Sequence, residues 1–504
     1  MKNFLIEKKI IFVIIFSGFS IAIFQFFYNR SLWLDESYLS LNIIHKSHLQ
    51  LLKPLALKQV APILFLQIEK FISELIPNSE LGLRIFPLLC FLCAIILFYN
   101  IIKLLVQNYY TIIFSLSLFV FNKTFIYYSS EVKQYMSDIL ILLIVYYLIL
   151  RNYKNPKYKY YTLAIVGMIG IFLSNASPII LFSAGLYLSF DIYKNNKKFY
   201  PYLIVISLIW VSTFLLYYAL FIHNHPSHEG MIIEWSYYKA FMPSNPLKID
   251  FYKFLFKQWA MIATSLCKFG IISLVFITSL AVLGIFSLIK KRKTSILIIT
   301  ITPLLLHLLL SCFKIYPFAQ RLILYILPCI IIICSFGFNH IMTFIFIHYK
   351  IEKNKLLAIF IPLIFISVFF RIGFPINKNE IKKSILFIEK NMSKNDIVYV
   401  NNLSSFPFKY YKDIAFVKID TNNIFWGQDV LFWNGEKWTA DTIKYANQLN
   451  SLRGRTWFLF TSVGDEKVKC KFLLDYCKYK KNNLIKEFHT HGSDVYLFDF
   501  IDRE

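Results

Sequence analysis

Charged residues are scarce in this chain of 504 residues. They make up 16% of the sequence, whereas soluble domains carry about 25%. Hydrophobic residues reach 57%, and the mean hydropathy is +0.55. The apolar excess is concentrated in long runs rather than spread along the chain. This composition excludes an ordinary soluble domain and predicts a multi-pass α-helical membrane protein.

Motifs for nucleotides and nucleic acids are also lacking. The sequence has no glycine-rich phosphate loop, no zinc-finger spacing and no basic amphipathic arm. The net charge is +25, but the abundance of Lys, Asn, Ile and Phe together is typical of a nucleotide bias in the genome, so we predict no nucleic-acid partner. Most of the eight cysteines lie inside apolar runs. Cys470 and Cys477 are two turns apart on a predicted helix, which is beyond disulfide reach.

Apolar runs that approach the length of a bilayer span, about 20 residues, recur along the chain. We predict eleven spans, at 10–28, 82–106, 111–128, 134–150, 160–176, 178–193, 200–222, 269–289, 295–313, 322–347 and 356–373. The first run resembles a signal peptide, but it is too long and lacks a small-residue cleavage site, so we expect it to remain as a span. The run at 111–128 is interrupted by Asn122 and Lys123.

Basic residues gather in alternate loops. The clusters are Lys2, Lys8 and Lys9, then Lys103, then 151–159, 194–198, 290–293 and 348–355. By the positive-inside rule, a cytoplasmic N-terminus explains all of them. The same orientation places the loop 29–81, the short turn near Glu131, the loop 223–268, the turn 314–321 and the tail outside. We therefore predict a protein of the cytoplasmic membrane with its tail outside the cytoplasm.

The composition changes after residue 373. The stretches "NDIVYV", "IAFVKI", "RTWFLFTSV" and "DVYLFDF" are typical of short strands, and three amphipathic stretches between and before them are typical of helices. Strands that alternate with helices predict a small extracytoplasmic α/β domain at 374–504. It would follow a transmembrane domain at 1–373.

Several ionisable residues fall at the outer ends of the predicted spans. They are Asp35, Glu36, Arg84, Glu131, Lys133, Lys314 and Arg321. Ionisable groups at such depth are costly and tend to be functional. Structural interpretations stay open: Asp35 can mark where the chain leaves the bilayer, Glu131 and Lys133 can pair with each other, and the other cations can be interfacial anchors.

This set of residues suits sugar transfer from a polyprenyl-phosphate carrier. The acceptor hydroxyl loses a proton as it attacks the anomeric carbon, and a carboxylate can accept that proton. The departing phosphate gathers negative charge, which Arg, Lys or a metal ion can stabilise. Both requirements can be met at the headgroup level, where the carrier phosphate sits while its tail stays in the lipid.

Four stretches in order resemble motifs of the family-39-type membrane glycosyltransferases of the GT-C superfamily. They are "SLWLDESYLSLNI", "LKQVAPILFLQIEKF", "NSELGLRIFPLLCFL" and "YYSSEVKQYMSDILI", which cover about the first 150 residues. The resemblance continues weakly through "SNASP", "EWSYYKAFMP" and "YPFAQRLILYILP", and the tail is similar to the outer domain of many bacterial members. This family includes protein O-mannosyltransferases and the lipid A aminoarabinose transferase.

The resemblance implies roles for particular residues. Asp35 is the expected base, with Glu36 beside it, and Glu131 is the acid of the second outer loop. Lys133 falls where family members often carry Arg or Lys, and Arg321 sits where a basic residue commonly faces the carrier phosphate. We assign Lys133, Arg321, Lys314 and Arg84 to the binding of that phosphate. Gln59, Ala61 and Pro62 match a segment that often reads "HPP", but no His precedes Pro62 here. If a divalent metal ion is used, Asp35 and Glu131 are its expected ligands.

The sequence therefore predicts an inverting glycosyltransferase that takes a hexosyl or pentosyl group from a polyprenyl-phosphate donor at the outer face of the membrane. The acceptor can be a lipid, a glycan or a protein. Two alternatives stay open: a transporter or flippase for lipid-linked saccharides, and a non-catalytic membrane protein that binds a glycan.

Overall fold

The chain forms two compact units. The fold comes from a computed structural model that describes residues 2–223, 225–226, 228–349, 375–429, 431–433, 438–461, 466–480 and 482–500. The first unit comprises the described parts of Met1–Phe27, Lys46–Ile72 and Arg84–Phe374. The second comprises those of Tyr28–His45, Ser73–Leu83 and Pro375–Glu504. The predicted span 356–373 lies outside the described residues.

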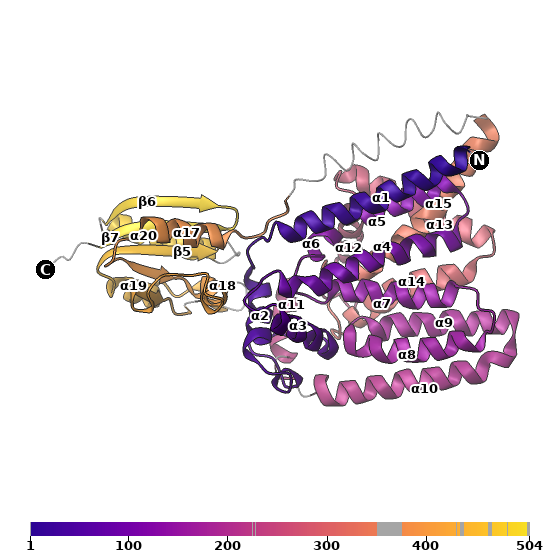
Figure 1. The fold of residues 1–504 in the computed structure, drawn as a ribbon, viewed down its shortest axis with the longest axis horizontal. Helices are drawn as coiled ribbons and strands as arrows, with labels where there is room; N and C mark the ends of the chain where they lie inside the picture. The colour runs from indigo at the N-terminus through magenta and orange to yellow at the C-terminus, as the bar shows by residue number, and fades with distance from the viewer. Residues whose placement is uncertain are drawn as a thin grey trace. The chain divides into compact units, whose positions relative to one another are not determined.

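Long apolar helices make up most of the first unit, and Figure 1 shows α7, α8, α9 and α10 running alongside one another. The helices with most or all of their residues in this unit are α1 (Lys2–Phe27), η1 (Gln50–Leu52), α3 (Ile63–Leu75), α4 (Ile85–Leu105), α5 (Tyr109–Val120), α6 (Lys123–Tyr128), α7 (Tyr135–Leu150), α8 (Lys157–Leu173), α9 (Ser177–Asn195), η3 (Lys197–Phe199), α10 (Tyr200–Tyr217), the π-helical turn η4 (Tyr218–Ile222), α11 (His228–Tyr237), α12 (Ile249–Leu266), α13 (Ile271–Lys290), α14 (Thr294–Cys312), η5 (Leu324–Ile326) and α15 (Leu327–Tyr349). The short turn η2 (Gly82–Arg84) leads into α4.

Six helical stretches among the described residues are long and apolar enough to cross a membrane. They are Lys8–Phe27, Gly82–Leu105, Lys197–Ile222, Ile271–Lys290, Thr294–Cys312 and Leu324–Ile347, and α5 and α7 are shorter apolar helices. Each predicted span from 10–28 to 322–347 overlaps at least one helix. The first unit is therefore a multi-pass helical membrane domain by length and composition, while the number of eleven crossings stays a prediction.

The predicted span at 111–128 is not one continuous helix, because the helix breaks at Asn122. α5 ends at Val120 and α6 begins at Lys123. The Asn122 side-chain oxygen accepts hydrogen bonds from the backbone N–H groups of Thr124 and Phe125, and its amide donates to the Ser265 carbonyl at 3.0 Å. Asn is a strong N-cap, so it starts a new helix where the run of apolar residues suggested a continuous one.

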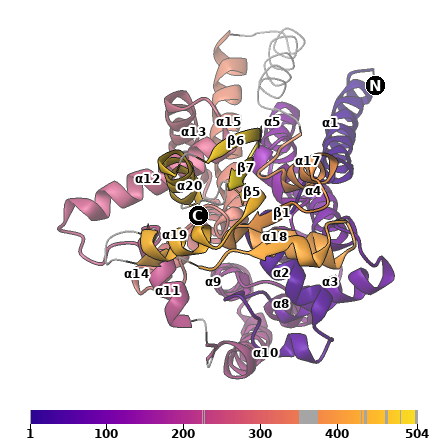
Figure 2. The same cartoon turned by 90° about the vertical axis from the view of Figure 1, so that its left-hand side faces the viewer.

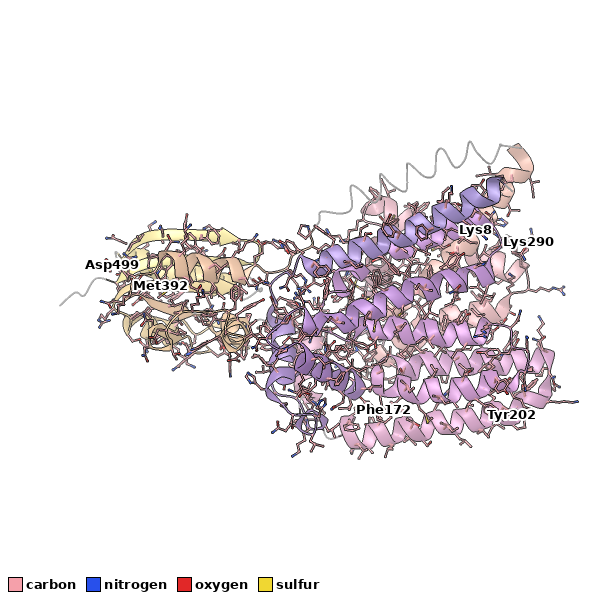
Figure 3. The ribbon with its side chains drawn as sticks, in the orientation of Figure 1. Lys8, Phe172, Tyr202, Lys290, Met392 and Asp499 are labelled. Atoms are coloured by element: carbon pink, nitrogen blue, oxygen red, sulfur yellow. The ribbon has the colours of Figure 1, made fainter. Side chains whose placement is uncertain are left out.

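Residues from the basic clusters lie at one end of the helices, as the positive-inside rule predicts. Figure 3 shows Lys8 on α1 and Lys290 at the end of α13 at the same end of the helices, together with Tyr202 near the start of α10. Phe172, close to the C-terminus of α8, lies toward the other end. Lys8 and Lys290 come from two of the clusters that the positive-inside rule places on one side. Which side faces the cytoplasm stays a prediction.

Helices α13 and α15 approach each other closely at two glycines. A Cβ added to Gly284 would overlap the Ile333 carbonyl oxygen, and one added to Gly337 would overlap the Leu280 carbonyl oxygen. Small residues at such crossings allow helix backbones to come into contact in membrane proteins.

The second unit is built around a five-stranded sheet with the order β2-β1-β5-β7-β6. Its elements are α2 (Leu34–His45), α17 (Ile381–Asn391), β1 (Ile397–Val400), α18 (Asn402–Asp413), η6 (Thr421–Asn423), β2 (Ile424–Trp426), β3 (Leu431–Trp433), β4 (Trp438–Ala440), α19 (Thr442–Asn450), β5 (Gly454–Thr461), α20 (Glu466–Tyr479), β6 (Asn483–Thr490) and β7 (Ser493–Phe500). β1 pairs in parallel with β2 and β5, whereas β7 is antiparallel to β5 and β6. β3 and β4 form a separate hairpin.

Helices cover both faces of this sheet. Alternate side chains of β5 point to opposite faces: Trp457 contacts Phe387 of α17, whereas Phe458 packs against Tyr399 in the cluster that includes Tyr445 of α19. Figure 2 shows α17 and α20 on opposite sides of the sheet. The second unit therefore has hydrophobic packing between the sheet and helices on both faces of the sheet.

The strands predicted at "NDIVYV", "RTWFLFTSV" and "DVYLFDF" correspond to β1, β5 and β7, and the predicted helices correspond to α17, α19 and α20. The strand predicted at "IAFVKI" is wrong. There Ala415 has a positive φ of 60°, and the N–H groups of Phe416 and Val417 turn back to the Tyr411 carbonyl, which ends α18. The sequence did not predict α18, β2 or β6.

We expect Gly284→Ala and Gly337→Ala each to lower the stability of the chain, because the added methyl group has no room against a backbone carbonyl. Overpacking of this kind costs about 1–3 kcal/mol. Thermal unfolding in detergent measures the effect. Gly185→Ala is the matched control, because a Cβ there meets no atom within 4 Å. Equal unfolding midpoints for all three variants would contradict the close crossing.

Candidate functional site

The acid pair lies in the first turn of α2, within the second unit. Asp35 is half-buried and Glu36 is fully buried. The N-terminal turn of a helix favours negative charge, because its backbone N–H groups point outward without helical partners. This end of α2 therefore suits two carboxylates, and only Asp35 presents part of its surface to solvent.

Glu36 forms an ion pair with Arg30. Its carboxylate accepts from the guanidinium at 2.6 Å, and the two side chains are 1% and 0% exposed. Removing one partner of such a buried pair leaves an uncompensated charge and is strongly destabilising. The structure thus gives Glu36 a clear positioning contact, which fixes the chain just before Asp35.

The C-terminal tail holds α2 in place. Tyr38 packs edge-on against Phe406 of α18 at 4.7 Å, and the His45 imidazole contacts the Asp413 carboxylate at 2.8 Å. Ahead of α2, the backbone N–H of Leu32 donates to the Tyr411 hydroxyl at 2.7 Å. The acid pair therefore belongs to the same compact unit as residues more than 360 positions further along the chain.

Further hydrogen bonds connect the C-terminal tail to the segments on either side of α2. The Tyr411 hydroxyl donates a short hydrogen bond to the Glu80 carboxylate. Lys382 donates to Glu80 at 2.7 Å and to the Asn29 carbonyl at 2.6 Å. These bonds join the tail to the two ends of the predicted loop 29–81, so the tail contributes to the placement of Asp35.

The second group of predicted residues lies in the turn between α6 and α7, in the first unit. All six residues from Ser129 to Gln134 are buried, with Glu131 at 0% and Lys133 at 6% exposure. The Lys133 ammonium donates to the Gln59 side-chain oxygen at 2.7 Å. This bond joins the turn to Gln59, which lies in the segment before α3 that resembles a family motif.

The three remaining cations have different surroundings. The Arg321 guanidinium lies over the Trp235 ring, 5.1 Å from its centroid, and is half-buried. Arg84 is fully buried at the start of α4. Lys314 is exposed in the turn after α14. The contact with Trp235 orients the Arg321 guanidinium within the first unit, as the bond to Gln59 orients the Lys133 ammonium.

The two groups of residues belong to different units: Asp35 and Glu36 to the second, and the other five to the first. A metal ion held by Asp35 and Glu131 stays a prediction. Among the described residues, no three His, Cys, Asp or Glu side chains form a group that could hold a metal ion.

Glu69 on α3 is a buried acid that the sequence reasoning missed. It is fully buried, and neither carboxylate oxygen hydrogen-bonds to a described residue. Burial raises the pKa of this carboxyl group well above its ordinary value. Helical periodicity gives the signal that could have found it, because Glu69 follows the buried Phe65 by four residues and so shares the apolar face of α3.

The fold and these residues define a class: a multi-pass helical membrane protein with a small α/β unit and buried charged residues at a helix connection. No family model matches the chain, and no curated protein matches it. A crystal structure of ArnT from Cupriavidus metallidurans bound to undecaprenyl phosphate aligns with 98% of this chain and 98% of its own, at 9% identity and a TM-score of 0.48. That identity and score are too low to show a shared fold or activity.

We expect Glu36→Gln to lower the free energy of unfolding by about 3–5 kcal/mol, because it replaces the carboxylate that is paired with the buried Arg30 guanidinium by a neutral amide. The double variant Arg30→Met and Glu36→Leu removes both charges and should recover most of that loss. Chemical unfolding of the three proteins measures this. If Glu36→Gln is as stable as the parent, the ion pair does not anchor α2.

Glu69 should make stability depend on pH. Because burial raises its pKa, the folded chain keeps a proton that the unfolded chain releases above the ordinary value of 4.5. Stability then falls as the pH rises above that value. Glu69→Gln cannot titrate, so its thermal midpoint should rise relative to the parent as the pH is raised above 4.5. The exposed Glu229→Gln is the control, and a pH-independent difference for Glu69→Gln would contradict the assignment.

Proposed function

We propose that the chain is an inverting glycosyltransferase that uses a polyprenyl-phosphate sugar at the outer face of the cytoplasmic membrane. The observation that carries this proposal is the buried polar turn Ser129–Gln134. Glu131 and Lys133 of this turn lie buried in a unit that is built largely of apolar helices. Charged groups in such surroundings are costly, and they persist where they serve a ligand or a reaction.

Lys133 suits the carrier phosphate. Its ammonium has three N–H donors, and Gln59 accepts one of them at 2.7 Å. This bond fixes the direction of the side chain before any ligand arrives, and preorganised charge is the most effective kind for stabilising a leaving group. Arg321 is the second cation we assign to the phosphate, because its contact with Trp235 holds the planar guanidinium in one orientation.

Asp35 is the proposed base. It stands half-buried in the first turn of α2, while Glu36 beside it is committed to Arg30. In the proposed step the acceptor oxygen forms a bond to the anomeric carbon as its proton passes to Asp35. The bond from that carbon to the phosphate oxygen breaks, and the phosphate leaves with the electron pair. Attack from the side opposite the phosphate inverts the anomeric centre.

The remaining assignments follow the same chemistry. Glu131 is placed as a second acid of the site, and Arg84 and Lys314 as further cations for the phosphate. If a divalent ion takes part, Asp35 and Glu131 are the residues that would hold it and it would supply charge for the departing phosphate. The acceptor is a lipid, a glycan or a protein, and the transferred group is a hexose or a pentose.

We expect Asp35→Asn to lower turnover by at least about 100-fold, since a positioned general base contributes about 10²–10⁴-fold. The substitution keeps the size of the side chain and removes its capacity to accept the proton. Transfer from a radiolabelled polyprenyl-phosphate sugar measures the rate.

Asp475→Asn is the matched control for this variant. It changes an exposed carboxylate on α20 of the same unit, and Asp475 has no assigned role in transfer. Both variants should elute and unfold like the parent protein, while only Asp35→Asn loses turnover. Undiminished transfer by Asp35→Asn would refute the base.

A further inference from the structure

A pocket of about 530 Å³ lies beside α12 in the first unit, and neither the predicted site residues nor the proposed reaction uses it. Its lining includes Lys257, Thr264, Ser265, Lys268, Gly270 and Gln320. Lys257, Ala260 and Thr264 recur at intervals of three and four residues along one side of α12, and Lys268 follows in the extended segment after the helix. The pocket is large enough for the polar part of a lipid but not for a whole one.

The lining of the pocket is suited to an anion. It combines two ammonium groups, the Ser265 hydroxyl and the Gln320 carboxamide, and none of the described residues that line it is acidic. The Thr264 hydroxyl donates to the Ala260 carbonyl at 2.7 Å and so contributes only its oxygen. Phosphate oxygens accept hydrogen bonds from each of these donor types. Sugars and neutral headgroups do not require two cations, so the pair Lys257 and Lys268 favours a phosphate ligand.

The walls of the pocket are held by local contacts. The Gln320 amide donates to the Ser265 hydroxyl at 3.4 Å, which ties the turn after α14 to α12. Gly270 has a φ of +57° and directly precedes α13, whose N-terminal end faces this region. A Cβ at Gly270 would meet no atom within 4 Å, so the pocket is open at this point. The positive end of the α13 dipole adds to the attraction for an anion.

Exposed apolar residues neighbour the lining residues in the sequence. Phe256, next to Lys257, is 64% exposed, and Phe269, Ile271 and Ile272, which follow Lys268, are 46%, 75% and 68% exposed. Large exposed apolar residues on the helices of a membrane domain contact lipid tails. A ligand that enters here therefore meets cations at one end and a lipid-facing surface at the other.

We propose that this pocket binds the phosphate headgroup of a membrane lipid, with the phosphate between Lys257 and Lys268 and the lipid tail along Phe256 and Phe269. The ligand class is a lipid phosphate monoester, whose two negative charges match the two ammonium groups. This proposal does not depend on sugar transfer, since it requires binding and no bond cleavage.

The test titrates fluorescent phosphatidic acid with the full-length protein in detergent. The double variant Lys257→Gln and Lys268→Gln should bind it about 25-fold more weakly, since each cation near a phosphate contributes about fivefold. Lys253→Gln is the matched control, because it removes an exposed charge from the same helix one turn before the pocket. It should bind within about twofold of the parent. Unchanged elution and unfolding midpoints show that the variants are folded.

Competition identifies the source of the phosphate. Short-chain phosphatidic acid should displace the probe, whereas short-chain phosphatidylcholine and inorganic phosphate should displace it at least about tenfold less well. Equal competition by phosphatidylcholine, equal competition by inorganic phosphate, or equal weakening by Lys253→Gln would each overturn the proposal. A failure here leaves the Asp35→Asn result unaffected, so the two hypotheses are tested independently.

Discussion

The hydrogen bond from the Lys133 ammonium to the Gln59 carboxamide is the interaction on which the account of the first unit depends. It joins residues 74 positions apart and fixes a charged side chain in a turn that is buried from Ser129 to Gln134. A neutral turn would connect α6 and α7 at a lower desolvation cost. Its burial and its polar partner therefore point to a ligand or a reaction that needs a cation at this position.

The second unit holds α2, a short helix with two acidic residues in its first turn. α2 has only 12 residues, and isolated helices of that length are marginal in water. Its stability comes from packing: Arg30 neutralises Glu36, and Tyr38 and His45 contact α18. The tail that supplies α18 is therefore part of the structure that positions Asp35, in addition to any role it has in selecting an acceptor.

The sequence predicted those features that depend on local composition. The apolar runs located the helices, and the short interval between two of them identified Glu131 and Lys133. The break at Asn122 was not predicted, because the amide is stabilised partly by the Ser265 carbonyl, 143 residues away. The contact between Leu32 and Tyr411 spans 379 residues, and no local pattern indicates it. The pocket beside α12 likewise needs Gln320 from another segment, so periodicity alone could not identify it.

The most direct test of the central claim is the fate of the carrier. The purified full-length protein is incubated with a panel of polyprenyl-phosphate sugars, labelled in the carrier, and with membrane extract as the source of acceptor. The account predicts that free polyprenyl phosphate is released in proportion to the amount of protein. Movement of an intact donor across a vesicle membrane, with no release of carrier phosphate, would contradict an enzyme and support a transporter.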